Sequence, residues 1–286
     1  MTGDRGPTPE PARQGRNADL GVRLISSAVL VPLALVCAWF GSWPTYGLAA
    51  AGAMIVFAEW AYVVDCSESL LPRRREVVLG VVFVGLASLI AGSSGVIAAL
   101  AVAAAGALGV AALGRSGWLV AGGVYAAMLG IAIAALRADP TYGFQALIVL
   151  LVLVWGTDSF AFFAGRSIGG PKLWPRVSPK KTWSGSIGGL VGGVAAALVA
   201  AATAGIAVTM GLTLLLVFLS LASQAGDLLE SAVKRHFNKK DSSGIIPGHG
   251  GMMDRVDGLV LAGALALVVG WLHSGAEQIA VGVLIW

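Results

Sequence analysis

Two acidic side chains in the C-terminal half of the chain could hold a metal ion. Asp227 ends one apolar run and Asp254 precedes the next. Helices over these runs would be antiparallel neighbours, so we expect both carboxylates at one depth of a membrane surface. Two carboxylates completed by waters and phosphate oxygens form a typical Mg²⁺ site. The pair therefore predicts metal-assisted chemistry on a phosphate, with Asp227 and Asp254 as the metal ligands.

The segment between these aspartates is rich in basic residues and glycine. Its positive charge is sufficient to offset a triphosphate, and Gly250 and Gly251 allow backbone N–H groups to approach an anion closely. His249 in the same stretch could act as a general acid or bind phosphate. The pattern predicts metal-dependent phosphoryl or nucleotidyl transfer. The candidate catalytic residues are Asp227, Lys234, Arg235, Lys240, Asp241, His249, Asp254, Arg255 and Asp257.

Polar residues form a stripe on the apolar segment that ends near Asp227. At spacings of three and four, the period of one helix face, the chain carries Ser220, Ser223, Asp227, Glu230 or Ser231, and Lys234. A polar stripe on a membrane helix must face a polar cavity or other protein groups. We therefore expect this face to line the substrate site.

Two polar clusters lie upstream of the stripe. Asp158 interrupts an apolar run, and a carboxylate there is costly unless it is paired or faces water or a cation. It is either functional or a structural partner of Arg166 or a loop lysine. Lys180 and Lys181 precede a Gly-rich helix and suit a polyphosphate or lipid head group, or they are ordinary loop charges. The candidate substrate-binding residues are Asp158, Arg166, Lys180, Lys181, Thr182, Ser223, Gln224, Ser231, Gly250 and Gly251.

The composition predicts that these residues are held by membrane helices. The 286 residues are 57% hydrophobic and 12% charged, whereas soluble domains carry about 25% charged residues. Apolar runs long enough to cross a bilayer predict an all-α, polytopic transmembrane helical bundle of about nine spans. The predicted spans are 24–41, 45–64, 77–93, 95–114, 118–136, 144–164, 186–205, 208–230 and 257–273.

The distribution of charge predicts the orientation. With a cytoplasmic N-terminus and nine spans, all but Arg137 of the 19 Lys and Arg residues fall on the cytoplasmic side, as the positive-inside rule requires. This sidedness explains the net charge of +4, so we expect no nucleic-acid partner. The longest cytoplasmic loops are predicted at 165–185 and 231–256.

The chain divides into three predicted regions. Residues 1–22 are predicted to form a disordered cytoplasmic tail, 23–136 the N-terminal transmembrane helices, and 137–286 the C-terminal catalytic region with its loops. The N-terminal helices carry almost no polar groups apart from Glu59, which is either a structural contact or functional. The segment 278–286 is too short to span and stays unassigned.

The stretch from Ser231 to Asp257 resembles the signature of the phosphatidate cytidylyltransferase (CDP-diacylglycerol synthase) family. Over 27 residues it combines Val-Lys-Arg, Lys-Asp-x-Ser, and Ile-Pro-x-His-Gly-Gly-Met-x-Asp-Arg-Val-Asp at fixed spacing. The resemblance extends upstream through the Lys180–Lys181 loop to Asp158. Two positions depart from the pattern, because Ser184 stands where Glu is frequent and Phe162 where Tyr is common, so no role is transferred to either.

The resemblance implies a homodimeric, all-helical enzyme of the cell (plasma) membrane with its active site on the cytoplasmic face. It would transfer CMP from CTP to phosphatidic acid, giving CDP-diacylglycerol and pyrophosphate. The family pattern assigns Mg²⁺ to Asp227 and Asp254, with a second, monovalent cation such as K⁺. Apart from the resemblance, our own hypothesis for the mechanism is that Lys180 and Lys181 hold the lipid phosphate and the basic residues of the later loop bind the triphosphate.

Three other functions remain compatible with the residues. CTP could activate another lipid phosphate, because acyl chains make unspecific contacts. Acidic residues and glycines inside membrane segments also occur in ion-coupled transporters, although here the acids gather at one membrane face. A purely structural scaffold is the least favoured of the three, because it gives no reason for buried carboxylates.

Overall fold

The computed structural model describes residues 28–65, 74–114, 116–245 and 250–286. Eight described helices are long and apolar enough to cross a membrane, which confirms the all-α, polytopic fold. They are α2 Ser42–Asp65, α3 Arg75–Ser93, α4 Val96–Gly114, α5 Gly117–Ala138, α6 Gly143–Ile168, α7 Trp183–Thr203, α8 Met210–His236 and α9 Met253–Ser274. The first predicted span lies partly outside the described residues, and its described part is the shorter helix Ala28–Phe40. The predicted tail, residues 1–22, lies wholly outside them.

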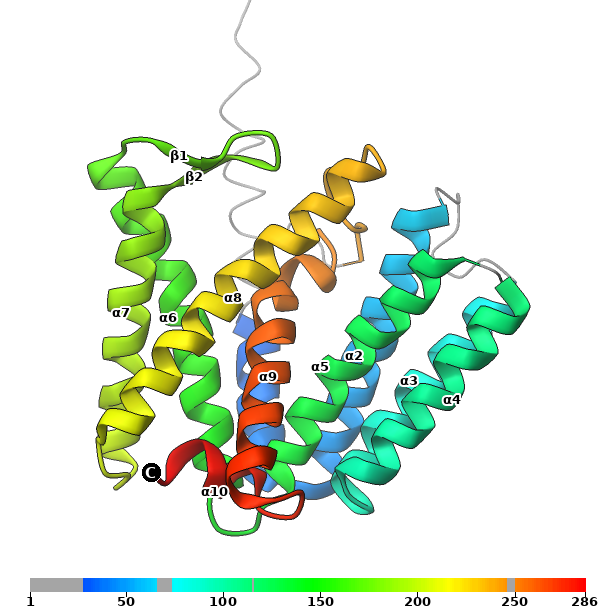
Figure 1. Ribbon diagram of the computed structural model, residues 1–286, viewed down its shortest axis with the longest axis horizontal. Coiled ribbons are helices and arrows are strands. Elements are labelled where there is room, and N and C mark those ends of the chain that lie inside the picture. Colours follow the sequence, from blue (N-terminus) through cyan, green and yellow to red (C-terminus); the bar gives the residue numbers. More distant parts are fainter. Residues whose placement is uncertain (1–27, 66–73, 115, 246–249) are drawn as a thin grey trace, which may run out of the picture.

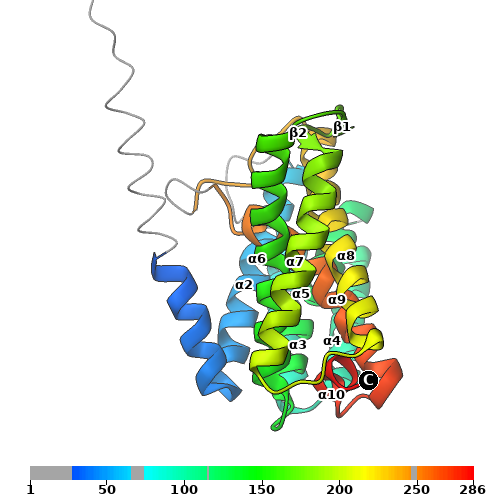
Figure 2. The same ribbon diagram turned by 90° about the vertical axis from the view of Figure 1, so that its left-hand side faces the viewer.

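Successive helices run up and down, so the bundle has two ends (Figure 1). We call the end with the β-strands, the last turn of α8 and the first turn of α9 the site end, and the opposite end the far end. Helices α2 to α5 pack together on one side, while α6 and α7 pair on the other. Helix α9 lies between these groups and contacts α5 and α8, and the turned view shows the helix Ala28–Phe40 beside the bundle (Figure 2).

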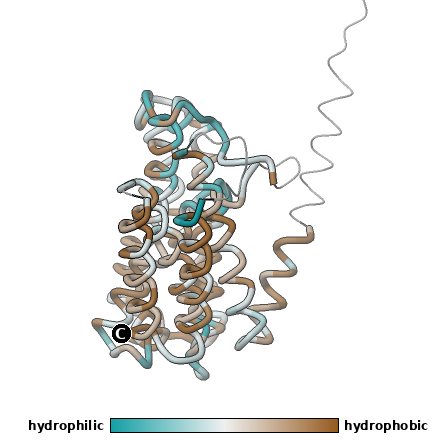
Figure 3. Tube along the Cα trace, turned by 90° about the vertical axis from the view of Figure 1, so that its right-hand side faces the viewer, coloured by the Kyte–Doolittle hydropathy of each residue, from teal (hydrophilic) through white to brown (hydrophobic). Residues whose placement is uncertain are grey.

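Hydrophilic residues gather at the ends of the bundle, most densely at the site end, and the middle is largely hydrophobic (Figure 3). All the described Lys and Arg residues except Arg137 belong to segments at the site end. Arg137 lies at the far end, where Nε donates to the carbonyl oxygen of Ala38 at 2.6 Å and Nη2 to that of Trp39 at 3.3 Å. The exception to the charge rule therefore caps the carboxyl end of the helix Ala28–Phe40.

Three local features differ from the sequence predictions. Helix α8 continues to His236, so Asp227 lies inside the helix rather than at its end. Val233 and Lys234 are buried, so the helix stays packed against its neighbours beyond Asp227. The loop 165–185 contains an antiparallel hairpin of β1, Lys172–Trp174, and β2, Ser178–Thr182. The unassigned C-terminal segment forms α10, Ile279–Leu284, whose buried side chains pack against α9.

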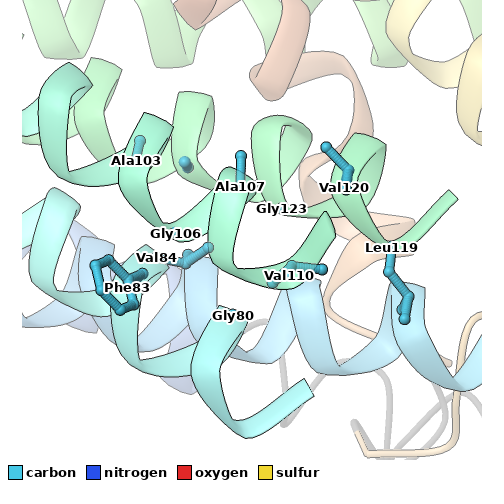
Figure 4. A pocket seen from close by; sticks show the side chains of 11 residues that line it. Gly80, Phe83, Val84, Ala103, Gly106, Ala107, Val110, Leu119, Val120 and Gly123 are labelled. Carbon is cyan, nitrogen blue, oxygen red and sulfur yellow. The ribbon is translucent and has the colours of Figure 1, made fainter. Parts of the chain in front are cut away.

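The N-terminal helices enclose a small apolar cavity between α3, α4 and α5 (Figure 4). Its lining contains only glycine, alanine and larger apolar residues, with no group that could bind a phosphate or a metal ion. The lining residues are Gly80, Phe83, Val84, Ala103, Gly106, Ala107, Val110, Leu119, Val120, Gly123 and Ala127. The cavity is therefore part of the helix packing and is lined by none of the candidate site residues.

Candidate active site

Helices α8 and α9 carry most of the candidate residues and touch backbone to backbone. A Cβ atom added to Gly226 would lie 2.4 Å from the carbonyl oxygen of Asp257, and one added to Gly258 would lie 2.5 Å from Oγ of Ser223. Small residues at a helix crossing allow this approach in membrane proteins. The crossing therefore places Asp227 of α8 level with Asp257 of α9.

Lys234 joins the same two helices nearer the site end. Its Nζ lies 2.8 Å from Oε1 of Glu230 and 2.5 Å from Oδ1 of Asp254. Lys234 is only 8% exposed and Glu230 only 1%, and buried charges of this kind need partners. Asp254 is thus level with Glu230 and Lys234, roughly one turn (~5 Å) from the level of Asp227. The sequence had predicted equal depth for the two aspartates.

The other oxygen of Asp254 is bound by the polypeptide around the α9 start. Oδ2 accepts hydrogen bonds from the backbone N–H groups of Ser242 at 3.1 Å and Gly251 at 2.9 Å, and from Oγ of Ser242 at 3.0 Å. A Cβ atom on Gly250 would lie 2.9 Å from the same oxygen. Gly250 also has φ of +81°, a conformation that favours glycine. Asp254 therefore fixes the local backbone through Oδ2, while Oδ1 faces Lys234.

Asp227 forms the centre of an acidic cluster. Its carboxylate pairs with the ammonium of Lys181, which strand β2 carries across from the hairpin, and Oγ of Ser231 lies 3.5 Å from its Oδ1. The carboxylates of Asp158 and Asp257 lie near enough to interact with it electrostatically. Three carboxyl groups gathered around one lysine form an acidic cluster that could receive a further cation.

Hydroxyl and amide groups line the inner side of this cluster. Thr157 and Ser220 share a buried hydrogen bond of 2.9 Å between α6 and α8, and Oγ of Ser186 donates to Oε1 of Gln224 at 2.5 Å. Oγ of Ser223 and Nε2 of Gln224 are buried without a partner among the described residues. The predicted polar stripe on α8 therefore faces protein groups, as expected.

The remaining candidates occupy more peripheral positions. Thr182 caps α7, since its Oγ1 accepts the N–H of Gly185 at 3.1 Å, and Arg166 lies over the ring of Phe162 at 6.0 Å. Arg235 donates to the carbonyl oxygen of Lys239 at 3.0 Å. Lys180, Lys240, Asp241 and Arg255 are exposed at the site end. His249 lies outside the described residues, so its predicted role stays a prediction.

Sequence reasoning did not select two glutamates that the structure brings into the site. Glu230 was visible as part of the α8 stripe, and its pairing with Lys234 gives it a definite place. Glu59 of α2 is fully buried and contacts the segment around Ser242 and the start of α9. The only signal for Glu59 was an acidic residue within a predicted membrane span.

The site fits a magnesium ion shared with a phosphate. No three His, Cys, Asp or Glu side chains of the described residues are arranged to hold a metal ion by themselves. Mg²⁺ is usually held by one or two carboxylates together with water and substrate phosphates. Asp227 already accepts a cationic partner, and its side chain is 29% exposed. The donor set therefore suits an ion that is completed by substrate oxygens.

Fold and site together define a polytopic membrane protein with an acidic, lysine-paired site at one end of its helical bundle. The chain belongs to the cytidylyltransferase family, whose model matches residues 21–273. This confirms the family resemblance predicted from the signature between Ser231 and Asp257.

Several bacterial relatives named phosphatidate cytidylyltransferase are similar to this chain. The protein from Brucella abortus biovar 1 (strain 9-941) is 45% identical over 154 residues, which cover 54% of this chain and 57% of the relative. The Bacillus subtilis (strain 168) protein is 39% identical over 142 residues, covering 49% and 53%. That of Haemophilus influenzae is 40% identical over 129 residues, covering 43% and 45%. The chain spans about half the length of the curated relatives it matches.

Proposed function

We propose that this protein is a phosphatidate cytidylyltransferase, which transfers CMP from CTP to phosphatidic acid and releases pyrophosphate. One observation supports this activity above the others: the acidic cluster around Asp227 lies beside exposed basic groups at the site end. A reaction between two polyanions needs this combination, because cations must offset the negative charge that the substrates bring together. The names of the bacterial relatives point to the same reaction.

Asp227 and Asp254 are the proposed ligands of Mg²⁺, and Asp158 and Asp257 would add negative charge beside Asp227. When bound, the ion would neutralise phosphate charge and stabilise the pyrophosphate leaving group. Lys181 pairs with the carboxylate of Asp227, and Lys234 with that of Asp254. A monovalent cation such as K⁺ remains part of the proposal as a second ion.

The basic residues divide into two sets by their position. Arg235, Lys240 and Arg255 are exposed at the site end, where they would bind the triphosphate. Lys181 lies beside Asp227. Once its ammonium group has left the Asp227 carboxylate, Lys181 would contact the phosphate of the lipid. Lys234 is buried between Glu230 and Asp254 and would orient Asp254 rather than bind substrate.

The reaction requires little proton transfer from the protein. An anionic oxygen of phosphatidate would attack the α-phosphorus of CTP in line, forming the new P–O bond as the bond to pyrophosphate breaks. Catalysis would come mostly from positioning and charge neutralisation. The acyl chains would stay in the bilayer beside the exposed apolar helix faces.

The proposed setting is the cell membrane of a bacterium, with the N-terminus and the site end in the cytoplasm. The gathering of basic residues at the site end supports this orientation under the positive-inside rule. CTP is a cytoplasmic substrate, so the same orientation gives it access. A homodimer is also proposed, from the family resemblance alone.

The test is incorporation of radiolabelled CTP into chloroform-soluble lipid by purified protein. We expect product with phosphatidate and Mg²⁺, and little with other nucleotides or with polyprenyl phosphate. Asp227→Asn should reduce turnover by at least about a hundredfold, which is the usual scale for loss of a charge-stabilising group. Asp65→Asn is the control, since Asp65 pairs with Arg74 at the surface. Preference for another lipid phosphate, or normal turnover by Asp227→Asn, would contradict the proposal.

A further inference from the structure

Glu59 of α2 reaches from the N-terminal helices to the site end and makes direct hydrogen bonds to the α9 region. It is 0% exposed. Oε1 accepts from Oγ of Ser243 at 2.5 Å and from the N–H of Met252 at 2.9 Å. Oε2 accepts from the N–H of Met253 at 2.6 Å and lies 3.2 Å from Oγ of Ser242. Both carboxylate oxygens are therefore fully used by neighbouring donors.

These partners require an acceptor that carries no hydrogens. Met252 and Met253 lie at the start of α9, where backbone N–H groups lack intrahelical partners and the helix dipole favours a negative charge. Of the two hydroxyl partners, Ser243 donates to Oε1, while the single hydrogen of the Ser242 hydroxyl lies between the carboxylates of Glu59 and Asp254. A glutamine amide would present two hydrogens on one side and could not accept from the Ser243 hydroxyl and from both backbone N–H groups.

Ser242 connects Glu59 to the proposed metal ligand. Its Oγ lies 3.2 Å from Oε2 of Glu59 and 3.0 Å from Oδ2 of Asp254, and its N–H also donates to Asp254. Gly251 completes the arrangement, because a Cβ atom there would lie 1.9 Å from Oγ of Ser242 and 2.7 Å from Oε1 of Glu59. The carboxylates of Glu59 and Asp254 thus hold one short piece of backbone between them.

We propose that Glu59 is a positioning residue for the reaction: it fixes the start of α9 and, through Ser242, the orientation of the Asp254 carboxylate. The residue belongs to α2, outside the part of the chain that carries the signature. The role in turnover rests on the proposed function, but the hold on the backbone does not. Loss of Glu59 should loosen the segments 242–245 and 250–254 and weaken binding of Mg²⁺ at Asp254.

Hydrogen–deuterium exchange tests the structural half of this inference without any substrate. In Glu59→Gln we expect the amides of Met252 and Met253 to exchange at least about tenfold faster, since one of them would face the NH₂ group and the other would keep only a neutral acceptor. Exchange in α5 and α6 should stay as in the unchanged protein. Asp65→Asn replaces another acidic residue of the same helix by its amide and is the matched control; it should leave all these exchange rates unchanged.

Turnover as a function of Mg²⁺ concentration tests the functional half. Glu59→Gln should raise the half-saturating Mg²⁺ concentration by about tenfold. Its thermal unfolding midpoint should fall by a few degrees, because a buried donor loses its acceptor. Glu59→Asp keeps an acceptor-only group and should restore part of the Mg²⁺ response. Ser242→Ala should show a smaller shift in the same direction.

Three results would overturn the inference. Unchanged exchange at Met252 and Met253 would remove the hold on the backbone. Faster exchange throughout the bundle with an unchanged Mg²⁺ response would reduce Glu59 to a general stabilising contact. Local loosening with a normal Mg²⁺ response would separate the loop from the metal ligand. If the unchanged protein transfers no CMP at all, the proposed function fails while the exchange result stands by itself.

Discussion

The two halves of the bundle use glycine in different ways. In the N-terminal group, α2 to α5, glycines receive aromatic rings: a Cβ atom on Gly122 would lie 2.2 Å from Cδ1 of Trp60, and one on Gly80 would lie 2.3 Å from the ring of Phe57. In the C-terminal group, α6 to α9, several glycines at helix crossings meet backbone, although Gly192 and Gly211 face the side chains of Phe160 and Trp286. Cβ atoms on Gly189 and Gly226 would lie 2.7 Å and 2.4 Å from carbonyl oxygens.

This difference separates packing from site construction. An aromatic ring packed against a glycine fills the space between two helices and keeps their backbones apart. Direct backbone contact brings the side chains on both sides of a crossing together, and at Gly226 these include Asp227 and Asp257. The comparison teaches that close helix approach in the C-terminal group assembles the acidic cluster, while the N-terminal group supplies a scaffold and the carboxylate of Glu59.

The largest effect should follow from widening the α8–α9 crossing. Gly226→Ala places a methyl group against the backbone of Asp257, which cannot move aside without shifting a helix, so turnover should fall by about a hundredfold. Gly122→Ala presses on the Trp60 ring and should cost about 1–3 kcal/mol of stability. Its turnover per folded molecule should stay within about twofold of the unchanged protein.

CMP transfer and thermal unfolding of both variants check this contrast. Gly47→Ala is the control, because an added Cβ there has nothing within 4 Å. An equal fall in turnover for Gly226→Ala and Gly122→Ala would break the distinction between the two halves.

An intermediate effect is expected at the hairpin. Lys181→Met removes the cation that competes with Mg²⁺ for Asp227, so the half-saturating Mg²⁺ concentration should fall severalfold. The partly exposed Lys181–Asp227 ion pair contributes about 1 kcal/mol, which sets the size of this change. Lys180→Met is the matched control, since Lys180 is exposed and it is Lys181, not Lys180, that pairs with Asp227. Mg²⁺ titration of turnover measures both. Identical responses would remove any special role of the Lys181–Asp227 pair.

The smallest effect on turnover is expected at the far end. Arg137→Met removes two hydrogen bonds to the carbonyl oxygens of Ala38 and Trp39. Stability should fall by about 1–3 kcal/mol, lowering the unfolding midpoint by several degrees, with an unchanged KM for CTP. Arg75→Met at the site end serves as the surface control. A large rise in KM for CTP in Arg137→Met would show that the far end communicates with the site.

Much of the membrane architecture was predictable because its signal is local. Eight predicted spans correspond to described helices, since a bilayer demands long apolar runs that are easy to read. The boundaries were less certain: α8 passes Asp227 and reaches His236 because amphipathic turns continue a helix beyond its apolar core. The hairpin of β1 and β2 was missed, since three and five residues carry too little periodicity to identify a strand.

The candidate site was predictable as a set of residues but not as a set of contacts. Asp158, Asp227 and Lys234 stood out because polar groups are rare in apolar segments. Their partners did not, since Lys181 reaches Asp227 from a hairpin and Glu59 reaches Met252 across 193 residues of sequence. The one-turn offset between Asp227 and Asp254 likewise depends on where α8 and α9 cross.

The amino-acid sequence by itself determined a helical membrane protein, the gathering of basic charge at one end, and the family to which the chain belongs. Those properties follow from residue type and spacing along the chain. Only the tertiary structure decided which lysine meets which carboxylate, and that Glu59 holds the start of α9. The physical reason is that such contacts are fixed by the approach of separate backbones, at Gly226, Gly251 and Gly258, which no local pattern records.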